Sequence, residues 1–136
     1  MNNFQYFGLF LSKDTRNMLL SLIRTEISSS ILDDAEKIFL DHCTLLHRSQ
    51  LHGNSELYSY LESQVGEQIT IKLTALGMSE KAFAFKVALP IFGICANKIP
   101  HITIATYRGG KPVDSNSITE WETIRPIEIP VKFEKR

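Results

Sequence analysis

Residues 41–45 read DHCTL and residues 100–104 read PHITI. Both stretches lie in segments rich in residues that favour strands, which predicts a strand at each. Each stretch places a histidine and a threonine two residues apart, and side chains two apart in a strand lie on the same face. The two pairs are His42 with Thr44 and His101 with Thr103. Cys43 and Ile102 are then expected to point the other way, into apolar packing.

The side chains of these two pairs suit acid–base chemistry on an anion. Two imidazoles that face each other across a cleft can act as general base and general acid, because the pKa of a free histidine is about 6.5. Threonine hydroxyls beside them can donate hydrogen bonds to the oxygens of a phosphodiester. This chemistry needs no metal and no cofactor. The alternative is that both histidines are ordinary strand residues next to threonines that favour strands.

The sequence around the two motifs alternates between strand and helix patterns. Strands are predicted at residues 4–11, 39–46, 68–76, 82–89, 99–107 and 127–133, and helices at residues 15–27 and 54–64. Strands that alternate with helices and end in a meander predict an α+β fold with antiparallel sheets. No linker or charge block interrupts the chain, so residues 1–136 are expected to form a single domain.

Composition excludes several classes of protein. The chain has 136 residues, and its 15 Lys and Arg balance its 15 Asp and Glu. Proteins that bind long nucleic acids carry a basic excess, so an extended nucleic-acid groove is not expected, whereas a short anionic ligand fits. The two cysteines, Cys43 and Cys95, are too few for a disulfide scaffold. No secretory signal or membrane segment is recognised, so the protein is expected to be cytoplasmic, with reduced thiols and no membrane partner.

The two motifs resemble the paired H-x-[ST] motifs of the two-histidine (2H) phosphoesterase superfamily. Residues 42–48 (HCTLLHR) are similar to the H-V-T-L-x-H-[KR] segment of the cyclic phosphodiesterase domain in plant- and fungal-type tRNA ligases. Residues 97–104 (NKIPHITI) resemble that family's N-K-x-P-H-I-T-L stretch, and residues 109–116 (GGKPVDSN) resemble its glycine-rich continuation. Cys43 departs from the commoner valine, and Ala105 stands near a position often held by tryptophan.

The resemblance implies a bilobal 2H phosphoesterase fold, with two antiparallel sheets and flanking helices around a central cleft. It implies that His42, Thr44, His101 and Thr103 are the catalytic residues, with His101 activating water and His42 protonating the leaving O3′. The implied reaction is metal-independent hydrolysis of a 2′,3′-cyclic phosphate to a 2′-phosphate in RNA end processing or repair. The implied partner is an RNA with a cyclic phosphate end or a small cyclic nucleotide.

Two other functions stay open at this point. One is a 2′,5′-phosphodiesterase that acts on linear or cyclic oligonucleotides. The other is a non-catalytic module that binds RNA ends or nucleotides, although two matched proton-transfer groups have no use in such a module.

Five further residues are candidates for weaker contacts with the substrate. Tyr6 and Tyr107 can stack on a base, although aromatic residues in strands are more often half-buried in a core. Arg48 and Arg108 follow the two motif strands and can reach a phosphate, although exposed arginines are usually only solvated. Gly109 can bring a backbone N–H group to an anion, or can simply belong to a tight turn.

The remaining histidines and Cys43 are not expected to bind metal. His47 lies an odd number of residues after His42, so a regular strand places it on the opposite face. We therefore expect a structural role for His47, unless a loop turns it back toward the phosphate. Since Cys43 also points away from His42, and His52 completes no second pair of ligands, a tetrahedral metal site is not predicted.

Overall fold

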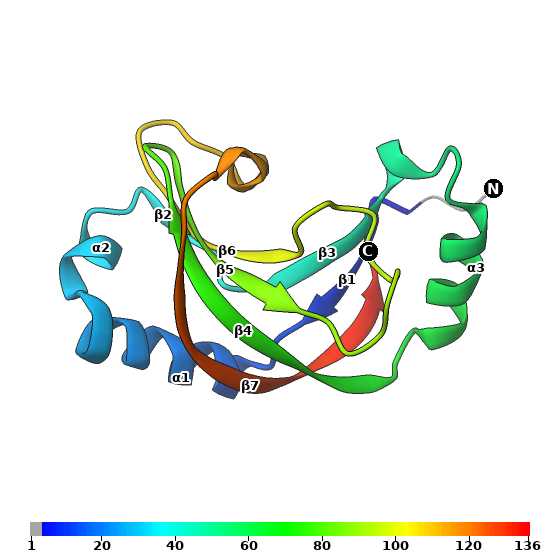
Figure 1. Cartoon of the computed structure of the whole chain (residues 1–136), viewed down its shortest axis with the longest axis horizontal. Helices are drawn as coiled ribbons and strands as arrows, with labels where there is room; N and C mark the ends of the chain where they lie inside the picture. Colours follow the sequence, from blue (N-terminus) through cyan, green and yellow to red (C-terminus); the bar gives the residue numbers. More distant parts are fainter. Residues whose placement is uncertain (1–3) are drawn as a thin grey trace.

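The computed structural model describes residues 4–136 and shows a strongly curved antiparallel sheet with helices at its two ends (Figure 1). The elements follow in this chain order: β1 (Tyr6–Phe10), α1 (Lys13–Leu22), η1 (Ile23–Ile27), α2 (Ser29–Asp33), β2 (Lys37–Ile38), β3 (His42–His47), η2 (Arg48–Gln50), α3 (Ser55–Gln64), β4 (Gln68–Met78), β5 (Ala82–Ala88), β6 (His101–Thr106), η3 (Pro112–Ser117) and β7 (Trp121–Lys135). Figure 1 shows α1 and α2 at one end of the sheet and α3 at the other.

The sheet closes on itself. Its strand order is β2-β6-β3-β1-β7-β4-β5, and an additional pairing between β6 and β5 joins six of the strands in a ring. All pairings are antiparallel. The predicted α+β fold with antiparallel pairing is therefore confirmed. The two separate sheets implied by the resemblance are not seen within residues 4–136, because β6 pairs along one edge with β5 and along the other with β2 and β3.

The first helix follows its sequence signals. The Ser12 Oγ accepts a hydrogen bond of 3.1 Å from the backbone N–H of Thr15, which caps α1. Leu19 and Ile23 are four residues apart, so they lie on one face of the helix, and both are fully buried. The single helix predicted for residues 15–27 begins at Lys13 and is divided, because α1 continues as the π-helical turn η1. None of the helices within residues 4–136 is long and apolar enough to cross a membrane.

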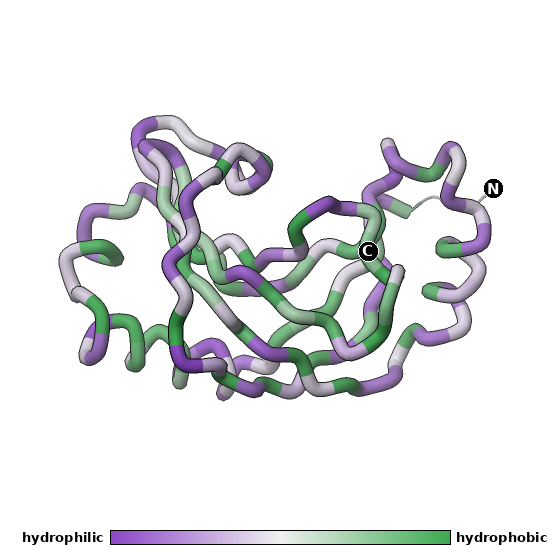
Figure 2. The backbone as a smooth tube through the Cα atoms, in the orientation of Figure 1, coloured by the Kyte–Doolittle hydropathy of each residue, from purple (hydrophilic) through white to green (hydrophobic). Residues whose placement is uncertain are grey.

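The core confirms the predicted alternation of the two motif strands. Cys43 and Leu45 of β3 and Ile102 and Ile104 of β6 are fully buried, whereas the motif histidines and Thr44 are partly exposed. Hydropathy likewise alternates along the long strand β4 and along the second half of β7 (Figure 2). Both cysteines are free. One face of each motif strand therefore packs against the core and leaves the other face for a site.

A sharp bend at Leu40 separates β2 from β3. Leu40 has φ 50°, in the left-handed region that costs a side chain with a Cβ roughly 1–2 kcal/mol. Its N–H group donates to the Thr103 carbonyl of β6 at 2.9 Å, whereas the next carbonyl, that of Asp41, accepts from the Leu11 N–H group at 3.0 Å. From this residue onward the chain is bonded to β1 on one side while it still lies beside β6 on the other. The fully buried Leu40 side chain holds the bend that begins β3.

Candidate active site

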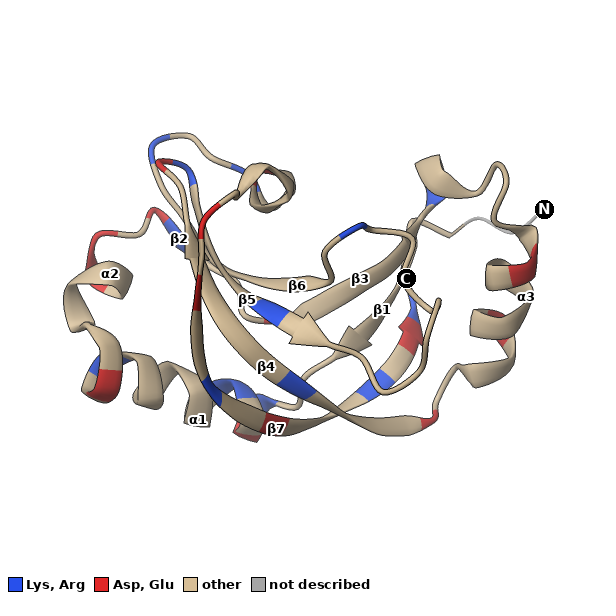
Figure 3. Cartoon of the chain, viewed as in Figure 1, with Lys and Arg blue, Asp and Glu red and all other residues tan. Residues whose placement is uncertain are grey.

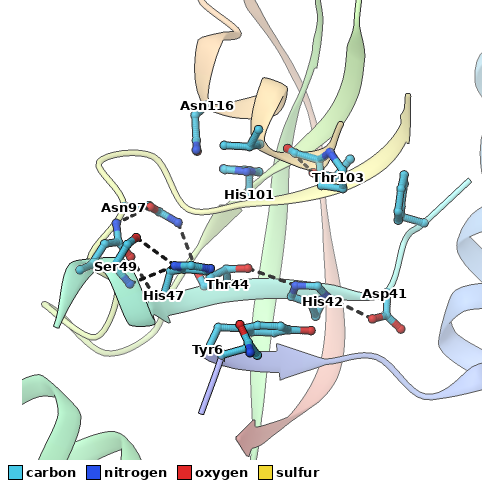
Figure 4. A pocket seen from close by; sticks show the side chains of 15 residues that line it. Tyr6, Asp41, His42, Thr44, His47, Ser49, Asn97, His101, Thr103 and Asn116 are labelled. Carbon is cyan, nitrogen blue, oxygen red and sulfur yellow. Dashed lines mark hydrogen bonds and ion pairs between the residues drawn. The ribbon is translucent and has the colours of Figure 1, made fainter. Parts of the chain in front are cut away.

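The two motifs meet where β3 contacts β6. Cys43 pairs with Ile102 in antiparallel register, and no other residue pair joins these two strands in the described chain. In an antiparallel pair the flanking residues run in opposite order, so His42 lies toward Thr103 and Thr44 lies toward His101. The structure therefore brings together the four residues predicted to be catalytic, and it places each histidine across from the other motif's threonine (Figure 4).

A carboxylate and a hydroxyl hold the His42 ring. Its Nδ1 lies 3.1 Å from the Asp41 Oδ2, and its Nε2 lies 3.1 Å from the Thr44 Oγ1. A carboxylate can only accept, so the Nδ1–H group donates to Asp41. In the neutral ring, Nε2 then accepts from the Thr44 hydroxyl. Asp41 thus orients the imidazole and favours its protonated form, as the carboxylate of an acid–base triad does.

The His42 ring lies on an aromatic platform from β1. Its centroid is 4.7 Å from that of Tyr6 and 4.9 Å from that of Phe10, with interplanar angles of 22° and 19°. Gly8 lies between these aromatic residues, and a Cβ there would lie 3.4 Å from the His42 Cδ2 and 3.1 Å from the Cys43 carbonyl oxygen. The tightest contacts would be with this carbonyl and, at 3.2 Å, with the Phe10 ring, so the missing side chain of Gly8 lets β1 and its aromatic platform lie close to β3.

Burial and the neighbouring Asp41 carboxylate shift the pKa of His42 in opposite directions. Burial is the largest influence and lowers the pKa of His42 below its usual value of 6.5. The hydrogen bond and the charge of Asp41 oppose this, whereas the charges of Arg136 and His101 lower the pKa further. Arg136 is near because its guanidinium carbon lies 4.0 Å from the Phe10 ring centroid. His42 is therefore mainly neutral at pH 7, and its protonated form is a stronger acid than free imidazolium.

His101 presents a different nitrogen environment. Its Nδ1 donates to the carbonyl oxygen of Ile99 at 2.9 Å. A carbonyl can only accept, so the neutral ring carries its proton on Nδ1 and its lone pair on Nε2. This arrangement suits a general base whose Nε2 takes a proton.

Thr103 is less free than Thr44. Its hydroxyl lies 2.8 Å from the Ser115 Oγ and donates to the Pro112 carbonyl oxygen at 3.3 Å. Ser115 is only 1% exposed, so this contact fixes η3 over the site. Thr44 therefore contacts the histidine of its own motif, whereas Thr103 contacts the segment that follows its strand. The two motifs are alike in sequence, so this difference could not be predicted from them.

His47 lies on the face opposite to the one predicted. In the ladder between β1 and β3, Gly8 pairs with Thr44 and Phe7 pairs with Leu46, so Leu45 is an extra residue that faces no partner on β1. Such a bulge reverses the alternation beyond it. His47 consequently lines the same pocket as the catalytic pair (Figure 4). The expectation that it points away from His42 was wrong, because it assumed a regular strand.

The residues predicted to make weaker substrate contacts divide into two groups. Tyr6 lines the pocket, but Arg48, Tyr107, Arg108 and Gly109 do not. The Tyr107 hydroxyl donates to the Ile31 carbonyl at 2.8 Å, and burial raises its pKa to about 12. The Gly109 N–H group donates to the Glu36 carboxylate at 2.6 Å, so it is engaged by a side chain of the protein outside the pocket.

The pocket over the junction has a volume of about 590 Å³. Asp41 is the only lysine, arginine, aspartate or glutamate among its described lining residues, and in the whole chain both signs of charge are interspersed (Figure 3). Within residues 4–136, no group of three or more histidine, cysteine, aspartate or glutamate side chains is arranged to hold a metal ion. Sequence reasoning missed Asp41, Gly8, Phe10 and Ser115. Only Asp41 had a clear signal, since it directly precedes His42.

Comparisons with known proteins identify the family of this chain and a solved structure with a similar fold. The family model of the fungal tRNA ligase phosphodiesterase domain matches residues 3–127. Among solved structures, one described as a crystal structure of a fungal RNA kinase matches 99% of this chain with a TM-score of 0.63 and 15% sequence identity. This chain covers 42% of that chain, so the likeness is to part of it and concerns the fold. No curated protein matches.

Proposed function

Since this chain belongs to the fungal tRNA ligase phosphodiesterase domain family, we propose that it is a phosphodiesterase that hydrolyses 2′,3′-cyclic phosphates at RNA ends. The observation that carries the proposal is the register of β3 and β6, which puts two histidine–threonine pairs around one pocket. A phosphodiester that enters this pocket meets a base and an acid without further rearrangement of the backbone.

We assign the general base to His101. Its Nε2 lone pair takes a proton from water, and the water oxygen attacks phosphorus. The bond between phosphorus and O3′ breaks, and O3′ takes a proton from the Nε2 of protonated His42. The product carries a 2′-phosphate and a 3′-hydroxyl. His101 is then protonated and His42 neutral, so His101 releases one proton to solvent and His42 takes one up, which restores the starting state.

Asp41 and Thr44 support the acid. The Asp41 carboxylate accepts from the His42 Nδ1–H group and stabilises the imidazolium before it donates its proton. Protonation of Nε2 also removes the lone pair to which the Thr44 hydroxyl donates. The hydroxyl is then released to donate to a phosphate oxygen. Protonation of His42 and binding of the anionic substrate therefore favour each other.

Three substrates, without added metal, test the proposal. They are 2′,3′-cyclic AMP, an RNA with a 2′,3′-cyclic phosphate end and a 2′,5′-linked oligoadenylate. We expect the first two to be hydrolysed to 2′-phosphates, identified by chromatography against 2′- and 3′-phosphate standards, and we expect His42→Ala to be inactive. Cleavage of only the 2′,5′ linkage would replace the proposal by the second function, and binding without turnover would show a binding module.

A further inference from the structure

His47 differs from the two catalytic histidines in the hydrogen bonds of its ring. The Ser49 N–H group donates to the His47 Nδ1 at 3.1 Å, and the Ser49 Oγ lies 2.9 Å from the same nitrogen. A backbone N–H group can only donate, so Nδ1 is an acceptor and the neutral ring carries its proton on Nε2. In His42 and His101 the proton lies on Nδ1 instead, because Nδ1 faces a carboxylate or a carbonyl.

The His47 ring is also held in position. Its backbone N–H group donates to the Gln50 Oε1 at 2.9 Å, and the Gln50 Nε2 donates to the Asn97 Oδ1 at 3.0 Å. The Asn97 Nδ2 in turn donates to the Thr44 carbonyl oxygen at 3.4 Å. The side chain that caps η2 is thus linked back to the catalytic strand, and its Nε2–H group is presented to the pocket at a fixed place.

With His42 neutral, the hydroxyls of both motifs are already engaged within the protein. The Thr44 hydroxyl donates to His42, and the Thr103 hydroxyl donates to the Pro112 carbonyl oxygen of η3. No lysine or arginine is among the described lining residues. The His47 Nε2–H group, in contrast, has no hydrogen-bond partner among residues 4–136. A neutral donor that is held rigid and left unpaired beside two proton-transfer groups is well placed to receive a charged oxygen.

We propose that His47 is a substrate-binding residue whose Nε2–H group donates a hydrogen bond to a phosphate oxygen and transfers no proton. The inference rests on the proposed function and deepens it, since it adds a third histidine with a separate role to the phosphodiester site. The oxygen belongs either to the scissile phosphate or to the neighbouring internucleotide phosphate, which present the same chemistry to the donor.

Three substitutions at this position separate donation from capping. His47→Asn keeps an acceptor for the Ser49 N–H group, since asparagine is a good helix cap, but removes the donor at the Nε2 position. His47→Gln places an amide N–H group near the Nε2 position, and His47→Ala removes both functions. His52→Ala, in the exposed turn before α3, is the control.

We expect His47→Asn and His47→Ala to raise KM about ten- to a hundredfold, with kcat and its pH profile little changed, and His47→Gln to restore most of the affinity. An effect on 2′,3′-cyclic AMP assigns the scissile phosphate, because that substrate has only one phosphate. An effect confined to a cyclic-phosphate-ended RNA assigns the neighbouring one. Unchanged KM on both substrates, or a displaced pH profile, would overturn the proposal.

A measurement without turnover keeps this test separate from the proposed function. Long-range ¹H–¹⁵N correlation spectra of the free protein should show His47 as the Nε2–H tautomer, and dimethyl phosphate should shift its Nε2 resonance but not that of His52. If the wild-type protein hydrolyses none of the substrates, the proposed function fails while this experiment still tests the donor. An Nδ1–H tautomer, or no response to the diester, contradicts the inference.

Discussion

Replacing Asp41 by asparagine removes the charge beside His42 but keeps an oxygen that can accept from Nδ1–H. The ring should therefore keep its orientation. Burial lowers the pKa of His42 and Asp41 opposes that effect, so the variant lowers this pKa further. If His42 is the general acid, the fraction of enzyme that carries the required proton falls at neutral pH.

The structure limits the size of this effect. The Asp41 side chain is 56% exposed and that of His42 is 26% exposed, so solvent screens the pair. Ion pairs this exposed contribute roughly 0.2–1 kcal/mol, which corresponds to a change of about 1.4- to 5-fold in the ratio of protonated to neutral His42. We expect kcat/KM at pH 7 to fall by the same factor. Loss of a negative charge by itself favours an anionic substrate, so weaker attraction cannot explain a fall.

The assay is kcat/KM for 2′,3′-cyclic AMP between pH 5 and 9, for the wild type and for Asp41→Asn. Asp33→Asn, at the exposed end of α2, is the matched control and should behave as the wild type. If His42 were the base, loss of the carboxylate would extend activity to lower pH and leave kcat/KM at pH 7 unchanged. That result would refute the assignment of acid and base.

The other predictions concern the hydroxyls, the platform and metal. Thr44→Ala should lower kcat/KM about ten- to a hundredfold with little change in unfolding temperature. Thr103→Ala should lower both kcat/KM and the unfolding temperature, because it also releases η3. Unchanged kinetics in either variant would show that this threonine only forms the strand. Gly8→Ala should lower kcat/KM about tenfold, because its Cβ would press on the Cys43 backbone and on the Phe10 ring that supports His42. Gly77→Ala, whose Cβ would lie 2.6 Å from side chains outside the pocket, should lower stability and leave the kinetics of the folded enzyme unchanged. Activity should persist in excess EDTA, and loss that is reversed by a divalent ion would contradict the proposed mechanism.

Local sequence patterns were enough to predict which residues of each motif lie on the same face of their strand. Alternation with period two placed His42 and Thr44 on one face and Cys43 on the other, because it depends only on neighbouring residues. The register between Cys43 and Ile102 could not be derived in this way, because it depends on strands far apart in sequence. The resemblance to a known family supplied the pairing of the two motifs that periodicity alone left open.

The errors came from features that tertiary structure decides. A bulge at Leu45 turned His47 into the pocket, and its only local signal is the run of two leucines that are both buried. The role of Gly109 was left open between an anion contact and a tight turn, and its N–H group donates to a carboxylate from the segment before β2. Such contacts depend on how loops pack, which neither composition nor spacing reveals.

The central claim is that His42 and His101 act as one catalytic unit, and alanine variants test it most directly. We expect a bell-shaped dependence of kcat/KM on pH for the wild type, with limbs that bracket roughly pH 5 to 8. His42→Ala and His101→Ala should each lose several orders of magnitude in kcat/KM on 2′,3′-cyclic AMP, and the double variant should be little worse than either one. The account would be contradicted if the loss of kcat/KM in the double variant equalled the product of the two single losses. Substantial activity in either single variant would also contradict it.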